Sequence, residues 1–199
     1  RPPRSTLFPY TTLFRSNVLT GFKFIGEVIG RLQDKRNYIC GFEESYGYLT
    51  GSYVRDKDAV NAAFMICEMF AFYKTRGMSL LDKLAKIYTT YGYCLNTLHS
   101  YEIPGSSGMA KMAEIMKGFH KGLDVIAGMK VVRTEDYLPG LNGLPKSDVL
   151  KYFTESGSVV VRPSGTEPKL KLYISVTAED RKAADSIEAA IVADLGKKL

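Results

Sequence analysis

The sequence is 199 residues long, with 45% hydrophobic, 24% charged and 12% aromatic residues. This length and composition suit one or two globular domains with a substantial core, and they exclude a disulfide-stapled mini-protein and an intrinsically disordered chain. The formal net charge of +6 favours anionic ligands but falls short of the dense basic stripes of a dedicated nucleic-acid binder. No apolar run approaches the roughly 18 residues of a membrane-spanning helix, so no membrane span is predicted.

The cysteines and histidines give little sign of a metal or redox site. Cys40, Cys67 and Cys94 lie far apart and form no CxxC pair, which predicts neither a disulfide framework nor a zinc site and favours a cytoplasmic location. His99 and His120 adjoin no serine or cysteine motif. We therefore expect them to be surface or half-buried residues.

Residues 1–16 differ in character from the rest of the chain. The triplet TLF occurs twice, RS stands near each copy, and the continuous apolar stretch of a secretory signal is missing. We expect a non-native or disordered leader. The native sequence is then expected to begin abruptly near Asn17, in the middle of a larger protein.

Residues 17–103 predict an α/β domain. A helix capped by Asp56 or Asp58 is expected to run to about Thr75, and its apolar residues cover most of its circumference, which predicts burial on more than one side. The expected elements in chain order are a helix at 22–32, a buried strand at 37–40, helices at 58–75 and 79–91, and a strand at 93–102.

The segment Pro104 to Gly108, spelled PGSSG, is the strongest linker signal in the chain, and we place a domain boundary there. Residues 104–199 then predict an α+β domain, because successive strands are closed by one amphipathic helix. Its expected elements are a helix at 109–120, strands at 129–134, 149–153, 158–161 and 169–177, and a last helix capped by Thr177.

The segment VRPSGTEPKLKL, residues 161–172, lies between two predicted strands and concentrates anion-binding groups. Arg162 offers a planar fork of donors, while Ser164 and Thr166 add hydroxyls two residues apart. Gly165 lets backbone N–H groups approach an oxyanion. These residues predict a phosphate cradle; the alternative is an ordinary polar hairpin. No GxxxxGK[ST] motif exists, so ATP chemistry has no support.

A second loop, CGFEESYGYLTG at residues 40–51, follows the predicted strand 37–40. Glu43 and Ser45 lie two apart and share a side in an extended loop, where they can bind neighbouring sugar hydroxyls. Glu43 and Glu44 are adjacent and point to opposite sides, which argues against a glycosidase pair. The alternative without a binding role is an acidic turn at the N-terminus of a helix.

Together the two loops resemble the α-D-phosphohexomutase superfamily, the phosphoglucomutase and phosphomannomutase enzymes, over roughly nine tenths of the chain. In that family a TGFK-like turn, here at residues 20–23, and a GEES-type sugar loop belong to the third of four domains. The loop RPSGTEPK belongs to the fourth. The spelling GFEESYGYLTG is similar to the bacterial phosphoglucomutase branch. The resemblance implies an α/β third domain and a fourth domain with a TATA-binding-protein-like fold.

The resemblance also implies roles for individual residues. Sugar contacts carry over to Glu43 and Ser45, with Gly21 and Phe22 in a substrate-facing turn matched more loosely. Lys57 in VRDKDA matches a lysine near the transferring phosphoryl group. The implied phosphate contacts are Arg162, Ser164, Gly165 and Thr166, with Lys169 and Lys171 where some relatives place a further basic contact.

Two family loops are missing from this sequence: the TASHN-type phosphoserine loop and the DxDxD magnesium loop. The intact enzyme is expected to use Mg²⁺ and a hexose 1,6-bisphosphate to interconvert hexose 1- and 6-phosphates. This chain is expected to grip hexose phosphate without turnover and without binding either cofactor, as a partner to missing N-terminal domains. Glucose, mannose and pentose phosphate specificities stay open. The other alternative is a non-catalytic anion- or nucleic-acid-binding module.

Overall fold

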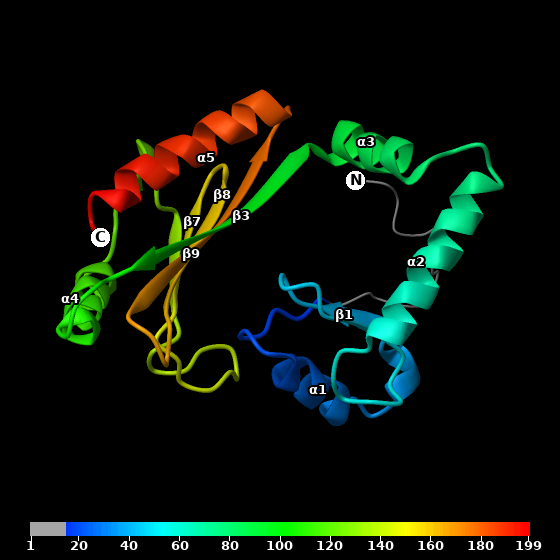
Figure 1. Ribbon diagram of the computed structural model, residues 1–199, viewed down its shortest axis with the longest axis horizontal. Helices are drawn as coiled ribbons and strands as arrows, with labels where there is room; N and C mark the ends of the chain where they lie inside the picture. Colours follow the sequence, from blue (N-terminus) through cyan, green and yellow to red (C-terminus); the bar gives the residue numbers. More distant parts are fainter. Residues whose placement is uncertain (1–14) are drawn as a thin grey trace. The chain divides into compact units, whose positions relative to one another are not determined.

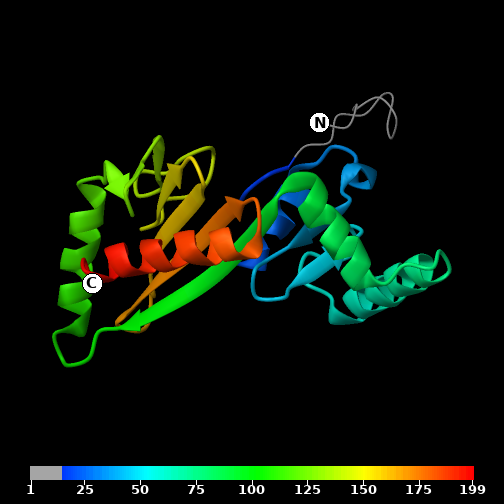
Figure 2. The same ribbon diagram turned by 90° about the horizontal axis from the view of Figure 1, so that it is seen from above.

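The computed structural model describes residues 15–199 and divides the chain into two compact units, one through Thr75 and the other from Arg76 to Leu199 (Figures 1 and 2). The TLF duplication and most of the leader predicted at residues 1–16 lie outside the described residues. Each unit is described by itself below.

The first unit contains two helices, a 3₁₀ turn and a short hairpin. The strand expected at 37–40 is wrong in position, because Asp34 accepts the Arg36 N–H and starts the 3₁₀ turn there. The strand begins at Cys40 instead. In chain order the elements are α1 (Phe22–Arg31), η1 (Lys35–Asn37), β1 (Cys40–Phe42), β2 (Tyr48–Thr50) and α2 (Ala59–Lys74).

The buried core of this unit is small. Phe22 and Ile29 of α1 pack with Leu49 of β2. Helix α2 begins as predicted, with the Asp58 carboxylate accepting the Asn61 N–H. The expected burial of α2 on more than one side is not found: no residue of α2 is buried among the described residues, and Val60 is 81% exposed. An apolar helix of this kind is normally covered on most sides.

The second unit is built on one antiparallel five-stranded sheet of order β3-β9-β8-β7-β6. The strand expected at 129–134 is split into the separate strands β5 and β6. The elements are α3 (Leu80–Tyr91), β3 (Tyr93–Glu102), α4 (Gly108–His120), β4 (Val125–Ile126), β5 (Met129–Lys130), β6 (Arg133–Asp136), β7 (Leu150–Thr154), β8 (Gly157–Pro163), β9 (Lys169–Ala178) and α5 (Arg181–Gly196).

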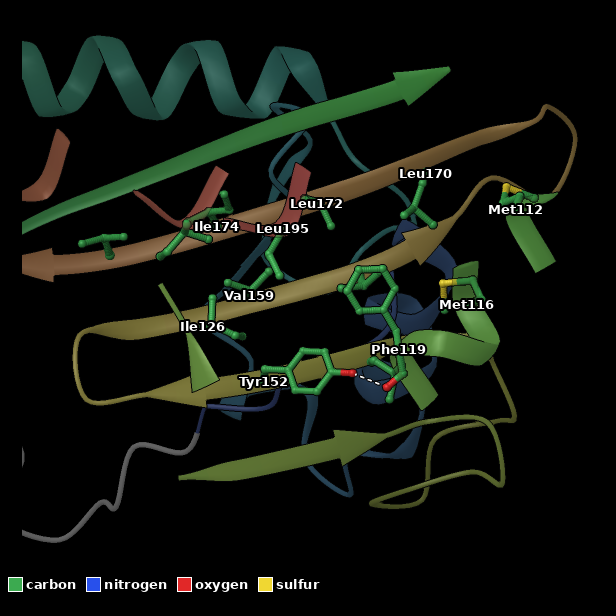
Figure 3. Packing of buried hydrophobic residues seen from close by; sticks show 14 of the residues in the cluster. Met112, Met116, Phe119, Ile126, Tyr152, Val159, Leu170, Leu172, Ile174 and Leu195 are labelled. Carbon is green, nitrogen blue, oxygen red and sulfur yellow. Dashed lines mark hydrogen bonds between the residues drawn. The ribbon is translucent and has the colours of Figure 1, made fainter. Parts of the chain in front are cut away.

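Alternation along the strands places the core on one face of this sheet. In β9, Leu170, Leu172 and Ile174 are buried, while the residues between them are half-buried. Such a period of two puts successive side chains on opposite faces. Helices α4 and α5 contribute Met116 and Leu195 to the same core (Figure 3). The other face of the sheet therefore carries the polar and charged residues of β8 and β9.

The domain boundary predicted at residue 104 differs from the division seen in the structure. Strand β3 pairs along its whole length with β9, from Tyr93 opposite Ala178 to Glu102 opposite Lys169. These backbone hydrogen bonds make β3 an edge strand of the second sheet, so the segment 104–107 joins two elements of one unit. The linker residues form a turn within that unit.

The last helix begins three residues later than predicted. Strand β9 continues to Ala178, which places Thr177 inside the sheet. The Asp180 carboxylate accepts the Ala183 N–H and caps α5 instead. Residues 15–199 contain no helix with the length and hydrophobicity needed to cross a membrane.

His120 joins the end of α4 to the edge strand β6 and to the segment before β7. Its Nδ1 lies 3.0 Å from Asp136 Oδ2 and its Nε2 lies 2.8 Å from Asp148 Oδ1. Burial lowers the pKa of His120, but the hydrogen bonds to Asp148 and Asp136 outweigh it, so the pKa is raised above its ordinary value. Nearby, the buried Tyr152 hydroxyl donates to the Phe119 carbonyl at 2.6 Å. The hydrogen bonds of His120 and of the Tyr152 hydroxyl thus fix the C-terminal end of α4.

The His120 bridge predicts a pH-dependent stability. A raised pKa means that protonated His120 stabilises the fold below about pH 6.5, and that this contribution is lost as the pH rises through the higher folded pKa. We expect His120→Ala to lower the free energy of unfolding by about 1 to 2 kcal/mol at pH 6, a value reduced for the partial exposure of both carboxylates. Urea unfolding of both proteins at pH 6 and pH 9 measures this; an equal difference at the two pH values would contradict it.

Candidate functional site

The residues expected to bind phosphate lie at the β8–β9 hairpin of the second unit. Arg162 stands opposite Lys171 in the register of the two strands, so the two side chains share one face of the sheet. Val161 and Leu172, next to them, are buried on the other face. Among residues 15–199, neither the Arg162 guanidinium nor the Lys171 ammonium group makes a hydrogen bond or an ion pair, although both backbones belong to the paired strands. The hairpin therefore presents two unpaired cations side by side.

The turn between the strands, residues 164–168, is organised by Ser164. Its N–H donates to the Lys169 carbonyl at 2.8 Å, and its hydroxyl oxygen faces the N–H groups of Thr166 and Glu167 at 3.5 and 3.3 Å. Gly165 is exposed, and its N–H has no partner in the described part of the chain. The Gly165 N–H is thus a free backbone donor at the tip of the turn, where an oxyanion can approach it.

Lys169 lies at the foot of the same turn but its charge is already offset. Its ammonium group is 3.1 Å from Glu102 Oε1 and 3.1 Å from Glu167 Oε2. The hydrogen bonds to Glu102 and Glu167 raise the pKa of Lys169 above its ordinary value. The sequence alone gives no sign of Glu102 at this site, because only the β3–β9 pairing brings residues 67 positions apart together.

The residues expected to bind sugar lie in the β1–β2 hairpin of the first unit. The Glu43 N–H donates to the Gly47 carbonyl at 2.9 Å, and Tyr46 adopts a left-handed backbone with φ of 64°. A Cβ at Gly47 would lie 2.6 Å from Glu43 Oε1, so the glycine leaves room for the carboxylate. Ser45 is exposed at the tip. The hairpin thus holds Glu43 in place and leaves the Ser45 hydroxyl accessible.

Lys57 follows this hairpin and precedes α2. Its N–H donates to Asp56 Oδ1 at 2.8 Å, and its ammonium group lies 3.3 Å from the same oxygen. That bond to the Lys57 backbone is the largest cause of the lowered pKa of Asp56. The Lys57 side chain is exposed, so the pair leaves its ammonium group accessible to an anion.

The turn at residues 20–23 corrects one expectation. Phe22 is only 4% exposed and packs with Ile29 and Leu49, so its side chain serves the core rather than facing a ligand. Gly21 has φ of 119°, a backbone conformation that favours glycine, and it starts α1 without a side-chain cap. Gly21 can therefore contact a ligand only through its backbone.

No metal centre is formed by the described residues: between residues 15 and 199, no three His, Cys, Asp or Glu side chains gather into a set that could hold an ion. Glu102 and Glu167 are paired with Lys169, and Asp56 is paired with Lys57. The residues present therefore do not fit a Mg²⁺ site, and no chemical step is assigned to a metal here.

Comparisons with known proteins match both parts of the chain to one family. A family model described as Phosphoglucomutase/phosphomannomutase, alpha/beta/alpha domain III matches residues 13–91, which include the β1–β2 hairpin. A second model, Phosphoglucomutase/phosphomannomutase, C-terminal domain, matches residues 108–193, which include the β8–β9 hairpin. The two matches follow in the order that the two loop motifs predict.

Individual relatives give the same result. The phosphoglucomutase of Staphylococcus aureus strain MRSA252 is 40% identical over 187 residues, which is 88% of this chain and 34% of that protein. The strain N315 protein is 39% identical over 188 residues, with the same coverage. The chain thus spans about a third of the length of the phosphoglucomutases it matches.

A solved structure supports the fold. The phosphoglucomutase-type phosphoprotein pp63/parafusin from Paramecium, in its open form, matches with a TM-score of 0.64 and 20% identity over 90% of this chain and 33% of that one. With the two family models, which between them cover both units, the result is plain: this chain belongs to the phosphoglucomutase/phosphomannomutase family and carries sequence of domain III and of the C-terminal domain.

Proposed function

We propose that this chain supplies the sugar and phosphate recognition of an enzyme that interconverts hexose 1-phosphate and hexose 6-phosphate by phosphoryl transfer. The observation that carries the proposal is the pair of cations without side-chain partners among the described residues, Arg162 and Lys171, beside a turn whose exposed Gly165 N–H has no acceptor there. Two cations and a free N–H donor match the charge and the acceptor oxygens of a phosphate group.

The proposed phosphate contacts are divided by chemistry. Arg162 binds two phosphate oxygens at once, and Lys171 adds a second charge from the neighbouring strand. Gly165 supplies its backbone N–H group at the exposed tip, while the Ser164 and Thr166 hydroxyls donate to the remaining oxygens. Lys169 supports the turn from below, because Glu102 and Glu167 occupy its ammonium group.

The proposed sugar contacts lie in the other unit. Glu43 accepts hydrogen bonds from sugar hydroxyls, Ser45 contacts a further hydroxyl, and the Gly21 backbone lines the approach. Lys57 is proposed to lie near the transferring phosphoryl group, where its cation would offset developing negative charge. The chain would thereby hold and orient the substrate for in-line attack.

The groups that transfer the phosphoryl are proposed to come from the rest of the intact protein. The sequence here contains neither the phosphoserine loop nor the magnesium loop that the resemblance implies. Mg²⁺ and hexose 1,6-bisphosphate therefore belong to the intact enzyme in this proposal. A reducing cytoplasm is proposed as its location, in keeping with the free thiols of Cys40, Cys67 and Cys94.

Weak binding is expected for the chain by itself. Four charge-assisted hydrogen bonds at about 1.5 to 3 kcal/mol each give roughly 6 to 12 kcal/mol. Association and ordering cost about 4 to 15 kcal/mol. Because the two terms nearly cancel, we expect dissociation constants in the millimolar range or weaker for glucose 1-phosphate.

We predict that Arg162→Ala abolishes the response of the hairpin to glucose 1-phosphate, because it removes the donor fork that engages two oxygens. Titration followed by the amide ¹H and ¹⁵N shifts of Gly165 and Thr166 measures the effect. Arg181→Ala is the matched control, since Arg181 lies on α5 and pairs with Asp185 there, and it should leave the response intact. An undiminished response in Arg162→Ala refutes the phosphate cradle.

A second prediction concerns the sugar loop. Gly47→Ala places a methyl group where the Glu43 carboxylate lies, so the carboxylate must move. The shifts that glucose 1-phosphate induces in the β1–β2 hairpin should weaken at least about twofold, while the melting temperature changes little because the collision is with a movable side chain. Gly165, in the other unit, should respond to inorganic phosphate as before. Unchanged hairpin shifts would remove Glu43 from the sugar site.

A further inference from the structure

Residues 102–108, which connect β3 to α4, contact the C-terminal end of the 164–168 turn. The Ile103 N–H donates to the Pro168 carbonyl at 2.8 Å. Glu102 reaches the Lys169 ammonium group at 3.1 Å, directly after Pro168 in the chain. Figure 2 shows β3 running into the loop that leads to α4. A segment about 60 residues earlier in the sequence thus lies against the proposed phosphate site.

Gly108, the first residue of α4, makes the closest of these contacts. A Cβ built on Gly108 would lie 2.3 Å from the Ile103 carbonyl oxygen and 2.9 Å from Pro168 Cβ. Both distances are too short for real atoms, and one of the two neighbours is backbone. Gly108 is buried, and its N–H donates to the Gly105 carbonyl at 3.0 Å. Only glycine at position 108 leaves room for Pro168 to pack against the start of α4.

We propose that residues 102–108 form a latch that fixes the conformation of the phosphate-binding turn, with Gly108 as its main positioning residue and Glu102 as a second one acting through Lys169. The inference rests on the proposed phosphate role of the turn. The latch holds the side of the turn that carries Pro168 and Lys169, and strand β8 holds the other side, where it ends at Pro163. The Gly165 donor is therefore placed before the ligand arrives, which lowers the entropy lost on binding.

The two parts of the latch differ in strength. The Gly108 contact is buried and close-packed, so an added methyl group forces residues 102–108 and the turn apart. The Glu102 carboxylate is 72% exposed, and exposed ion pairs contribute little. Gly108→Ala should therefore have the larger effect and Glu102→Gln the smaller one.

The negative charge of Glu102 allows one titration to separate two explanations of its role, because they predict opposite changes in the affinity for an anion. Removing a carboxylate near an anion site strengthens anion binding if the carboxylate acts only through its charge. Loss of a latch residue weakens binding, because the turn becomes less ordered. The two explanations predict opposite changes in the same titration.

The experiment compares four variants of the full chain by ¹⁵N relaxation and by titration with glucose 1-phosphate. Gly108→Ala is matched by Gly118→Ala, which lies in the same helix with nothing within 4 Å of its added Cβ. Glu102→Gln is matched by Glu155→Gln, an exposed residue between β7 and β8. Because Glu102 is exposed, its variant should fold even if Gly108→Ala is unstable.

The latch predicts that both test variants increase the fast motion of the Gly165 and Thr166 amides without ligand, and that neither control does. Gly108→Ala should also weaken binding of glucose 1-phosphate about fivefold or more, and Glu102→Gln should weaken it slightly. Wild-type order and affinity in both test variants would overturn the latch, as would tighter binding in Glu102→Gln. Altered motion with unchanged affinity would also overturn its role in binding. A wild-type chain that shows no response to glucose 1-phosphate would instead overturn the proposed function.

Discussion

The alternation of side chains along β9 is the constraint on which the proposed site depends. Leu170, Leu172 and Ile174 are driven into the core beneath α4 and α5, which forces Lys169, Lys171 and Tyr173 onto the opposite face. A shift of one residue in the pairing of β9 with β8 would exchange the two faces. The same burial that stabilises the sheet therefore places Lys171 beside Arg162, and it leaves both cations on the face away from the core.

The features of the sequence that act locally could be read from it directly. The caps at the two helix starts join residues three positions apart: Asp58 accepts the Asn61 N–H at α2, and Ser79 and Asp82 form a capping box at α3. Such local bonds make helix starts predictable from sequence. The two loop motifs also led to the correct family, which the two family models confirm. The TATA-binding-protein-like fold of the last domain stays a prediction from resemblance.

Features that depend on distant pairing could not be read in this way. The strand at 93–102 was assigned to the first domain because PGSSG follows it. Its hydrogen-bonded partner β9 lies about 75 residues later, and this pairing makes it part of the sheet of the second unit. The ion pair of Glu102 with Lys169 arises from the same pairing. Phe22 was matched to a substrate-facing turn by its sequence context, whereas its burial depends on Leu49 across the first unit. In each case the deciding contact is not local.

The two units differ in how completely they bury their apolar residues. The second unit has a continuous core beneath its sheet, whereas the described part of the first buries chiefly Phe22, Ile29 and Leu49 and leaves α2 uncovered. The matched phosphoglucomutases are about three times as long as the aligned part of this chain. Recognition by this chain is therefore proposed as one part of a larger enzyme's work.

The most direct test of the account is a crystal structure of the chain with glucose 6-phosphate. The account predicts that the phosphate group lies over the 164–167 turn, within hydrogen-bond distance of the Arg162 guanidinium and the Lys171 ammonium group and of the Gly165 N–H. A phosphate group bound elsewhere on the protein, with the Arg162 guanidinium directed into solvent and the turn empty, would contradict it.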